Sequence, residues 1–502
     1  MNRNQKNHEF SHGGKPHPHF EKKELTNAGS HGKERKKSPV SPRQNSEQTH
    51  FRRKDNTDSP YSPKSGKPGP AYKKRSVESV SRNPRSTAGR FRSDEERPQS
   101  VFQPVNEPSE SFSDIFFRLA KLPEGTSPAG MEYNEEVSVK KHACEKFFTA
   151  HAIACGDCKF IPSPEPRHYR TTSKRKVSIS GGHPVFSMGY SLKHESGESV
   201  AGAALMEVEL HGQIYAAALD ILSKKHYSPL AHALNFVIIR GTRVSAAVVM
   251  NLWQISGTIV HKLKMFAAEL QSAVPAVASV FMFLDESRSD YYFDSFRPHA
   301  PVDFKRICGT SMVPLKMEGK PVFLYPPTVF SQVNESILPE FTSAAMDLAG
   351  LSPAKRFIDL YCGYGLFSFC AAPYAGEVIG MDFEGPAIRA ARANAEHLFP
   401  DKNLSFDASV ITAETLRSRL PFSGTKKEVI LLDPPRNGTE SGVIGAISDR
   451  APERVIAVYC SADQMAREVR IWNGCGFQVR KIRIFDMFPG SPNIETMLLL
   501  SR

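Results

Sequence analysis

The C-terminal part of this sequence predicts an open α/β fold, in which a mostly parallel sheet carries helices on its faces. Residues 356–365 (RFIDLYCGYG) have the pattern of a buried strand that ends in a glycine-rich turn and opens a helix. Three later strand-like segments end in Asp382, Asp433 and Cys460. Open α/β sheets bind their ligands at the carboxyl ends of the strands, so these groups mark the expected site.

The glycine turn is the first element of this prediction. Gly363 and Gly365 allow the backbone to turn tightly where a ligand lies close to it. Asp382 follows 17 residues after Gly365, at the position where a carboxylate accepts hydrogen bonds from a ribose diol. A plain strand-to-helix connection has the same glycine pattern, so the later strands carry the prediction.

The N-terminal residues 1–110 predict a disordered basic arm. Residues 1–100 contain 23 Lys and Arg against 11 Asp and Glu, whereas the rest of the chain has 42 of each, so the arm holds the whole formal charge of +12. Such an arm attracts phosphate backbones without reading their sequence. The alternative is a solvated tail with no dedicated partner.

No segment indicates secretion or a membrane. The start MNRNQKNHEF has no apolar core, and the longest apolar run, near residues 273–284, is too short to cross a bilayer. We therefore expect a soluble protein of the cytoplasm with no membrane partner.

Residues 111–329 predict an α+β central domain that begins with a cysteine-containing segment. Its second half alternates strand-like and helical patterns, such as NFVIIRGTRVSAAVVM and GTIVHKLKMFAAELQSA. Eight cysteines in 502 residues are too few for a disulfide scaffold. Cys144 precedes the CxxC pair of Cys155 and Cys158, a spacing that suggests metal or redox chemistry in an intracellular protein.

Six segments, in order, resemble the family of S-adenosylmethionine-dependent RNA 5-methyluridine (uracil-C5) methyltransferases. The segments are FSQVN (330–334), DLYCGYGLFS (359–368), GMDFEGPAIRAARANAE (380–396), LLDPPRNG (431–438), VYCSADQMARE (458–468) and DMFPGSPNIET (486–496). The resemblance implies a class I, Rossmann-like and seven-stranded methyltransferase domain at residues 330–502. It also implies S-adenosyl-L-methionine as the cofactor.

The resemblance further implies which residues border the cofactor. They are Gln332, Asp359, Tyr361, Gly363, Gly365, Leu366, Asp382 and Asp433. Asn334 would help to order the site. Arg436 stands where methyltransferases of exocyclic amines commonly carry an aromatic residue, which argues against an amine as the methyl acceptor.

Uracil carbon 5 is a poor nucleophile until a thiolate adds to carbon 6 and places negative charge on carbon 5. Cys460 stands at the family's nucleophile position, and Glu495 matches the family's catalytic glutamate, the base that removes the carbon 5 proton. The family usually has Ser-Cys-Asn-Pro around its nucleophile, whereas here Tyr459, Ser461 and Ala462 flank Cys460. The alternative to an enzyme is therefore an RNA-binding or RNA-folding protein that retains the fold without turnover.

Part of the family holds a 4Fe-4S cluster on four cysteines, and the resemblance implies three of those ligands here. Cys144, Cys155 and Cys158 match, and His211 stands where the fourth is expected. A Cys3His site also suits zinc, and a degenerate site without metal is the third possibility.

The resemblance implies structured RNA as the partner of a monomeric protein. Because the cluster belongs to the ribosomal branch of the family, ribosomal RNA of the 23S type is the first expected substrate and transfer RNA the second. Four basic residues are expected to contact phosphates, namely Arg170, Lys174, Arg175 and Lys176.

Overall fold

The computed structural model describes residues 110–123, 126–154, 156–187, 203–288, 304–424 and 426–502. The chain divides into two units, residues 1–100 and 101–502, and every described residue belongs to the second unit. The predicted basic arm thus lies outside the described residues except for Glu110.

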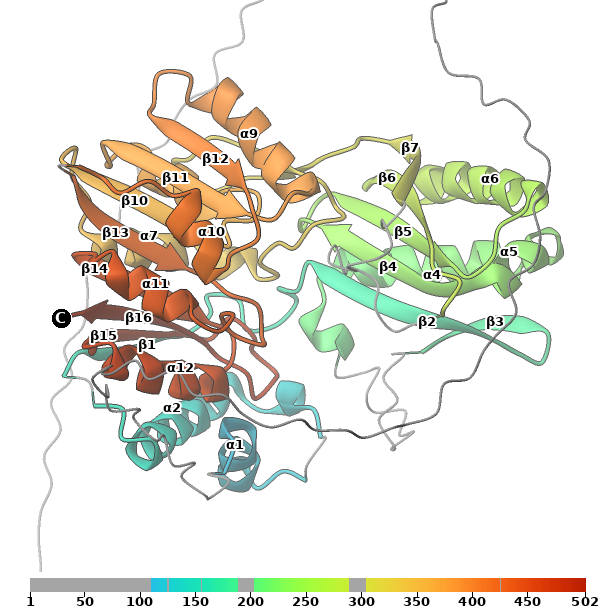
Figure 1. The fold of residues 1–502 in the computed structure, drawn as a ribbon. Coiled ribbons are helices and arrows are strands. Elements are labelled where there is room, and N and C mark those ends of the chain that lie inside the picture. Colours follow the sequence, from blue (N-terminus) through green and yellow to red (C-terminus); the bar gives the residue numbers. More distant parts are fainter. Residues whose placement is uncertain (1–109, 124–125, 155, 188–202, 289–303, 425) are drawn as a thin grey trace, which may run out of the picture. The chain divides into compact units, whose positions relative to one another are not determined.

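An eight-stranded sheet forms the core of the C-terminal half, in the strand order β1-β15-β16-β14-β13-β10-β11-β12 (Figure 1). Its strands are β1 (Cys158–Ile161), β10 (Lys355–Leu360), β11 (Glu377–Asp382), β12 (Leu404–Ala408), β13 (Lys427–Leu432), β14 (Arg454–Tyr459), β15 (Gln478–Phe485) and β16 (Glu495–Ser501). Only β16 runs antiparallel to its neighbours. The predicted seven-stranded sheet is confirmed, and β1 adds an eighth strand at its edge.

Helices cover both faces of this sheet because its central strands are apolar on both sides. In β10, Phe357 packs into one hydrophobic cluster, whereas Ile358 and Leu360 pack into another, since side chains alternate along a strand. The first cluster includes residues of α7 (Leu338–Ala349), α8 (Leu366–Ala371) and α9 (Pro386–Leu398). The second includes residues of α1 (Phe112–Ala120), α2 (Tyr133–Ala150), α10 (Ala413–Ser418), α11 (Val443–Asp449) and α12 (Ala462–Gly474).

Helices α1 and α2 and strand β1 pack with the eight-stranded sheet, although the sequence assigns them to the central domain at 111–329. Phe112 and Phe147 lie in the same cluster as Trp472, and Cys158 pairs with Ile482 of β15. Nothing local in the sequence signals this pairing, because its two strands lie at opposite ends of the described chain. The boundary at residue 329 stays a prediction.

A second, six-stranded sheet has the order β3-β2-β4-β5-β6-β7 (Figure 1). Its strands are β2 (Thr172–Ser180), β3 (His183–Ser187), β4 (Leu234–Gly241), β5 (Ala246–Leu252), β6 (Val277–Leu284) and β7 (Phe304–Gly309). One hydrophobic cluster joins this sheet to α4 (Glu209–Ser223), α5 (Ser228–Ala233) and α6 (Gly257–Ala273). The α+β character predicted for this region is confirmed.

Short elements complete the described chain. They are the hairpin of β8 (Val313–Leu315) and β9 (Phe323–Tyr325) and the 3-10 turns η1 (Pro128–Gly130), η2 (Lys225–Tyr227) and η3 (Glu335–Ile337). None of the helices in the described part of the chain is both long enough and apolar enough to cross a membrane.

Candidate active site

Polar side chains gather at one edge of the eight-stranded sheet. Asp382 ends β11, Asp433 follows β13 and Cys460 follows β14. These three strands and β10 are parallel neighbours, so their carboxyl ends meet at the same edge. The strand ends predicted from the sequence therefore converge in space.

The glycine turn between β10 and α8 is held by Asp382. Its Oδ2 accepts a hydrogen bond from the Gly363 amide at 2.6 Å, and its Oδ1 accepts one from the Phe383 amide at 2.7 Å. Gly363 has a φ of +55°, and an added Cβ would meet nothing within 4 Å. The turn is therefore open at Gly363, and its backbone is exposed to a ligand at the sheet edge.

The same turn closes against the core at Gly365. Gly365 has a φ of +95°, and a Cβ there would lie 2.8 Å from the ring of Phe369. Any side chain would clash, so glycine is needed directly before α8. Leu366, the first residue of α8, is buried, which leaves its backbone as the part able to face a cofactor.

Two buried polar atoms of this turn lack protein partners among the described residues. Oδ2 of Asp359 accepts a hydrogen bond from Ser368 at 2.6 Å, but Oδ1 has no partner, and the hydroxyl of Tyr361 has none either. Burial raises the pKa of Asp359 to about 7. Unpaired buried polar atoms beside an open turn fit a site that takes a polar ligand.

Cys460 and Glu495 are brought together by the pairing of β14 with β16. Tyr459 pairs with Thr496 in this antiparallel ladder, so Cys460, one residue after Tyr459, lies beside Glu495, one residue before Thr496. Glu495 is 2% exposed, whereas Cys460 is partly exposed. A partly exposed thiol and a buried carboxyl group therefore share the sheet edge.

The charged groups around the thiol shift one another's pKa values. Burial and the negative charges of Glu495 and Asp433 together raise the pKa of Cys460 to about 12, while Arg436 opposes them through its charge and a hydrogen bond. Burial raises the pKa of Asp433 to about 7. Burial and then Asp433 hold the pKa of Glu495 well above its usual range, against the effect of Arg436. Burial at this edge thus favours the protonated forms of these groups.

The DPPRNG loop that carries Asp433 and Arg436 is fastened to α12. The side-chain amide of Gln464 donates to the carbonyl of Pro435 at 3.2 Å, and Oε1 of Glu468 accepts from the Thr439 amide at 2.6 Å. Helix α12 begins directly after the nucleophile position, where the Ser461 hydroxyl accepts from the Gln464 amide and caps the helix. One helix thus fixes both Cys460 and the loop beside it.

The segment before α7 reaches the same region from another direction. Gln332 is partly buried. Asn334 is fully buried, and its side-chain amide donates to the hydroxyl of Ser163 at 3.0 Å and to the carbonyl of Met487 at 3.3 Å. Asn334 therefore links this segment to the loop between β15 and β16.

The predicted metal ligands do not assemble in the described chain. Cys144 is buried in α2, where burial raises the pKa of its thiol, and Cys158 begins β1. His211 lies in α4, where its Nδ1 is hydrogen-bonded to Ser173 at 2.8 Å and burial lowers its pKa to about 3. Cys155 lies outside the described residues. Among the residues that are described, no three His, Cys, Asp or Glu side chains are grouped to hold a metal ion.

Arg175 is not placed as the sequence suggests. It is buried, and Glu207 binds its guanidinium through both carboxylate oxygens at 2.8 and 2.6 Å. This ion pair makes Arg175 part of the central domain's structure. Lys174 and Lys176 both lie over the ring of Phe236, and Arg170 donates to the carbonyl of Thr172.

Sequence reasoning missed two contributions to the site. Arg436 was noticed only because it replaces an aromatic residue, although a cation directly after Asp-Pro-Pro signals a charge near the reacting groups. The second is Lys140, which contacts Asp486 across the fold. No local pattern pairs two residues so far apart in the chain.

Comparisons with known proteins agree with this geometry. The family described as tRNA (Uracil-5-)-methyltransferase matches residues 314–502. An uncharacterized RNA methyltransferase of Geobacter sulfurreducens is 26% identical over 68% of this chain and 67% of its own length. The 23S rRNA (uracil(1939)-C(5))-methyltransferase RlmD of Marinomonas posidonica is 37% identical over 36% of this chain, but that match spans only 40% of RlmD.

A solved structure shares the fold. The tRNA (uracil-54, C5)-methyltransferase of Pyrococcus abyssi, in complex with S-adenosyl-L-homocysteine, superposes with a TM-score of 0.53 at 16% identity and covers 74% of this chain and 82% of its own. At this level of identity the likeness to the solved structure is one of fold. The match to the family described as tRNA (Uracil-5-)-methyltransferase spans residues 314–502, which is less than half of the chain.

Proposed function

We propose that this protein methylates carbon 5 of a uridine in structured ribosomal RNA, with S-adenosyl-L-methionine as the methyl donor. The observation that carries the proposal is the adjacency of Cys460 and Glu495 across β14 and β16, beside Asp433 and Arg436. A thiol and a carboxyl group at the cofactor edge are the two groups that this reaction needs.

The residues around the glycine turn fit the cofactor. Asp382 would accept hydrogen bonds from the ribose diol, and the open backbone at Gly363 would lie against the nucleoside, in a turn that Gly365 allows to pack on the core. Asp359, Tyr361, Asp433, Gln332 and the backbone of Leu366 would line the remainder of this site. When bound, S-adenosylmethionine supplies an electrophilic methyl group on a sulfonium cation.

The protein's part in the reaction falls to two side chains. The Cys460 thiolate adds to carbon 6, and the displaced electron pair makes carbon 5 nucleophilic enough to take the methyl group, which leaves S-adenosylhomocysteine as the second product. The Glu495 carboxylate then takes the proton from carbon 5. The electrons of that C–H bond re-form the ring double bond, and the sulfur–carbon 6 bond breaks to release Cys460.

Nearby charge affects how readily both groups ionise. The pKa values of Cys460 and Glu495 are raised, first of all by burial, which disfavours both anions. Arg436 already favours the thiolate. A cationic donor beside them would favour both anions further, because opposite charges at close range stabilise the charged forms.

Ribosomal RNA is the first substrate class because the RlmD relatives carry that activity in their names and are 32 to 37% identical to the catalytic segment. Transfer RNA is the second, and the description of the matching family favours it. In either RNA the base would have to leave its stack, since addition at carbon 6 needs access to the ring face. The proposal does not include an iron–sulfur cluster. It does include a location in the cytoplasm and a monomeric state.

Trapping of the covalent intermediate tests the reaction. Glu495→Gln keeps the size of the side chain but cannot remove the proton, so we expect an RNA–protein adduct that survives denaturing electrophoresis. Cys460→Ala is the matched control and should form none. If Glu495→Gln forms no adduct with either RNA and the wild-type protein transfers no methyl group, the protein is a binding or folding factor and the proposal is wrong.

Nucleoside mass spectrometry identifies the substrate class. Ribosomal and transfer RNA from cells with and without the gene are digested, and 5-methyluridine is measured in each pool. Loss from ribosomal RNA supports the first substrate class, and loss from transfer RNA supports the second.

A further inference from the structure

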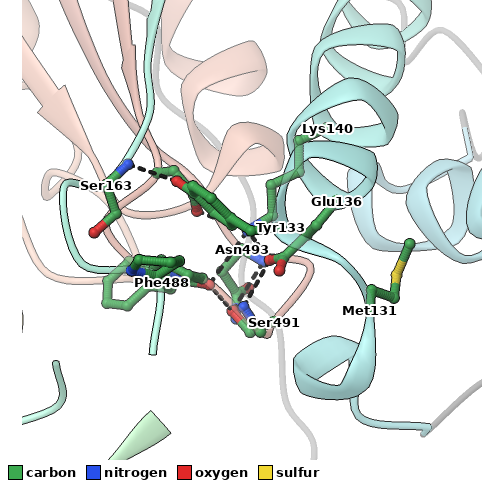
Figure 2. Close-up of polar contacts among 12 residues, drawn as sticks. Met131, Tyr133, Glu136, Lys140, Ser163, Phe488, Ser491 and Asn493 are labelled. Atoms are coloured by element: carbon green, nitrogen blue, oxygen red, sulfur yellow. Dashed lines mark hydrogen bonds and ion pairs between the residues drawn. The ribbon is translucent and has the colours of Figure 1, made fainter. Parts of the chain in front are cut away.

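Four charged side chains meet in the interior between α2 and the loop 486–494, which joins β15 to β16. Lys140 is fully buried, and its ammonium donates to Glu136 Oε1 at 2.8 Å, to Asp486 Oδ1 at 2.7 Å and to the carbonyl of Phe488 at 3.3 Å. Arg167 donates to the other oxygen of Glu136 at 3.2 Å. Two cations and two anions therefore form a neutral group, which we call the α2–loop network. Figure 2 labels two of its members, Glu136 and Lys140, together with Phe488 of the loop.

The network holds the loop by its backbone. Glu136 Oε1 also accepts a hydrogen bond from the Gly490 amide at 2.6 Å, and Lys140 binds the carbonyl of Phe488. Two further side chains hold neighbouring carbonyls: Tyr169 donates to Pro489 at 2.9 Å, and Asn334 donates to Met487. Four consecutive residues of the loop, 487–490, are thus each fixed by a side chain from elsewhere in the chain.

Attachment of α2 to the sheet does not require these charges. Ala143 and Phe147 of the same helix are buried in the hydrophobic cluster beneath the sheet. A buried ion pair usually adds little stability compared with apolar side chains of the same volume, because both charges lose their hydration. The ammonium instead fixes the relative positions of the groups around it, because its three N–H donors point at three specific acceptors.

We propose that Lys140 is a positioning residue for the removal of the carbon 5 proton. The loop that it holds, residues 486–494, leads directly into Glu495, which opens β16. Cys460 lies between β14 and α12, outside this loop, so a shift of the loop is expected to displace Glu495 more than Cys460. This inference rests on the proposed function.

An experiment that measures thiol addition and proton removal separately tests this role of Lys140. Lys140→Met keeps the length of the side chain and removes the charge, and Lys146→Met, an exposed position on the same helix, is the matched control. RNA of the class identified by the nucleoside comparison is prepared with uridine or with 5-fluorouridine. Fluorine at carbon 5 cannot leave as a proton does, so 5-fluorouridine RNA traps the adduct without any need for Glu495.

For Lys140→Met we expect a fall in kcat of roughly 10- to 100-fold, the usual effect of misplacing a catalytic group by about 1 Å. Adduct should accumulate on uridine RNA, while the rate of trapping by 5-fluorouridine RNA stays at the wild-type value. Lys146→Met should match the wild type in both. A parallel loss of turnover and of 5-fluorouridine trapping would reduce Lys140 to a structural role and overturn the inference, as would unchanged turnover.

A milder variant covers the case in which Lys140→Met fails to fold. Glu136→Gln keeps an oxygen that can accept from Gly490 and removes one charge, so a smaller accumulation of adduct on uridine RNA is expected. If Glu136→Gln also turns over normally, the network has no part in proton removal. If the wild-type protein is not trapped by 5-fluorouridine RNA, the proposed function itself has failed.

Discussion

Asp433 and Glu495 are two carboxyl groups that share a buried edge with a thiol. Burial raises the pKa of both, and the charge of Asp433 raises that of Glu495 further. Such paired groups retain a proton near neutral pH, because two neighbouring anions cannot both be accommodated in a desolvated site. The protonation of these two carboxyl groups should therefore depend on the charge of what binds beside them.

The affinity for S-adenosylmethionine is predicted to rise with pH below about 7. Asp433 is protonated below its raised pKa of about 7 in the free protein, and a bound sulfonium favours its carboxylate, so binding releases a proton. The dissociation constant should fall up to tenfold per pH unit below 7 and become constant above about 8. Titration calorimetry in buffers of different ionisation enthalpy measures the released proton.

Asp433→Asn is the control for this prediction. In this variant the dissociation constant for S-adenosylmethionine should depend less on pH in the same range. An affinity that is independent of pH, or that falls as pH rises, would contradict the assignment of Asp433 to the cofactor site.

At the scale of elements, the start of α12 explains how the altered surroundings of Cys460 can be accommodated. The family pattern places Asn after the nucleophile and Pro after that, whereas this chain has Ser461 and Ala462. Ser461 caps α12, and Ala462 is its first residue. Ser and Asn are both good N-caps, and Pro and Ala both suit the first helical position, so these departures keep the helix start intact.

Ser461→Ala is predicted to destabilise the protein by about 1 kcal/mol, because the backbone amide of Gln464 loses its hydrogen-bond acceptor. Ser461→Asn should retain most of that stability, since asparagine caps equally well. Thermal or urea unfolding measures the difference. Equal losses in the two variants would show that the cap contributes nothing and that another contact of Ser461 matters.

Across the whole molecule, residues far apart in the chain build the catalytic half together. Strand β1 pairs with β15, and Lys140 of α2 contacts Asp486. The first hundred residues carry the whole formal excess of +12, while residues 101–502 balance. Catalysis and long-range attraction to RNA are therefore expected to reside in different parts of the chain.

Removal of residues 1–100 is predicted to weaken RNA binding and to lessen its salt dependence, while kcat at saturating RNA stays unchanged. Each phosphate that the arm neutralises contributes about 0.7 to 0.9 to the slope of log affinity against log salt. Filter binding across a salt series measures this slope. A full-length variant with the arm's Lys and Arg replaced by Gln separates charge from length, and an unchanged slope in both would leave the arm without an electrostatic role.

Local patterns in the sequence were sufficient to predict much of the fold and of the candidate site. Apolar runs specified the strands, and the need for positive φ explains Gly363 and Gly365. The strand ends located Asp382, Asp433 and Cys460, and ordered motifs pointed to Glu495. Each of these patterns spans only a few neighbouring residues. Over that range the side chains of a strand or helix point alternately toward and away from the core with a regular period.

Only the tertiary structure decided which distant groups meet. It paired Arg175 with Glu207, placed Nδ1 of His211 against Ser173, and brought Lys140 to Asp486. It also added β1 to the catalytic sheet. Ion pairs and strand registers of this kind depend on the path of the whole chain, because charge and hydrogen bonding select partners by distance in space and leave no periodic trace in the sequence.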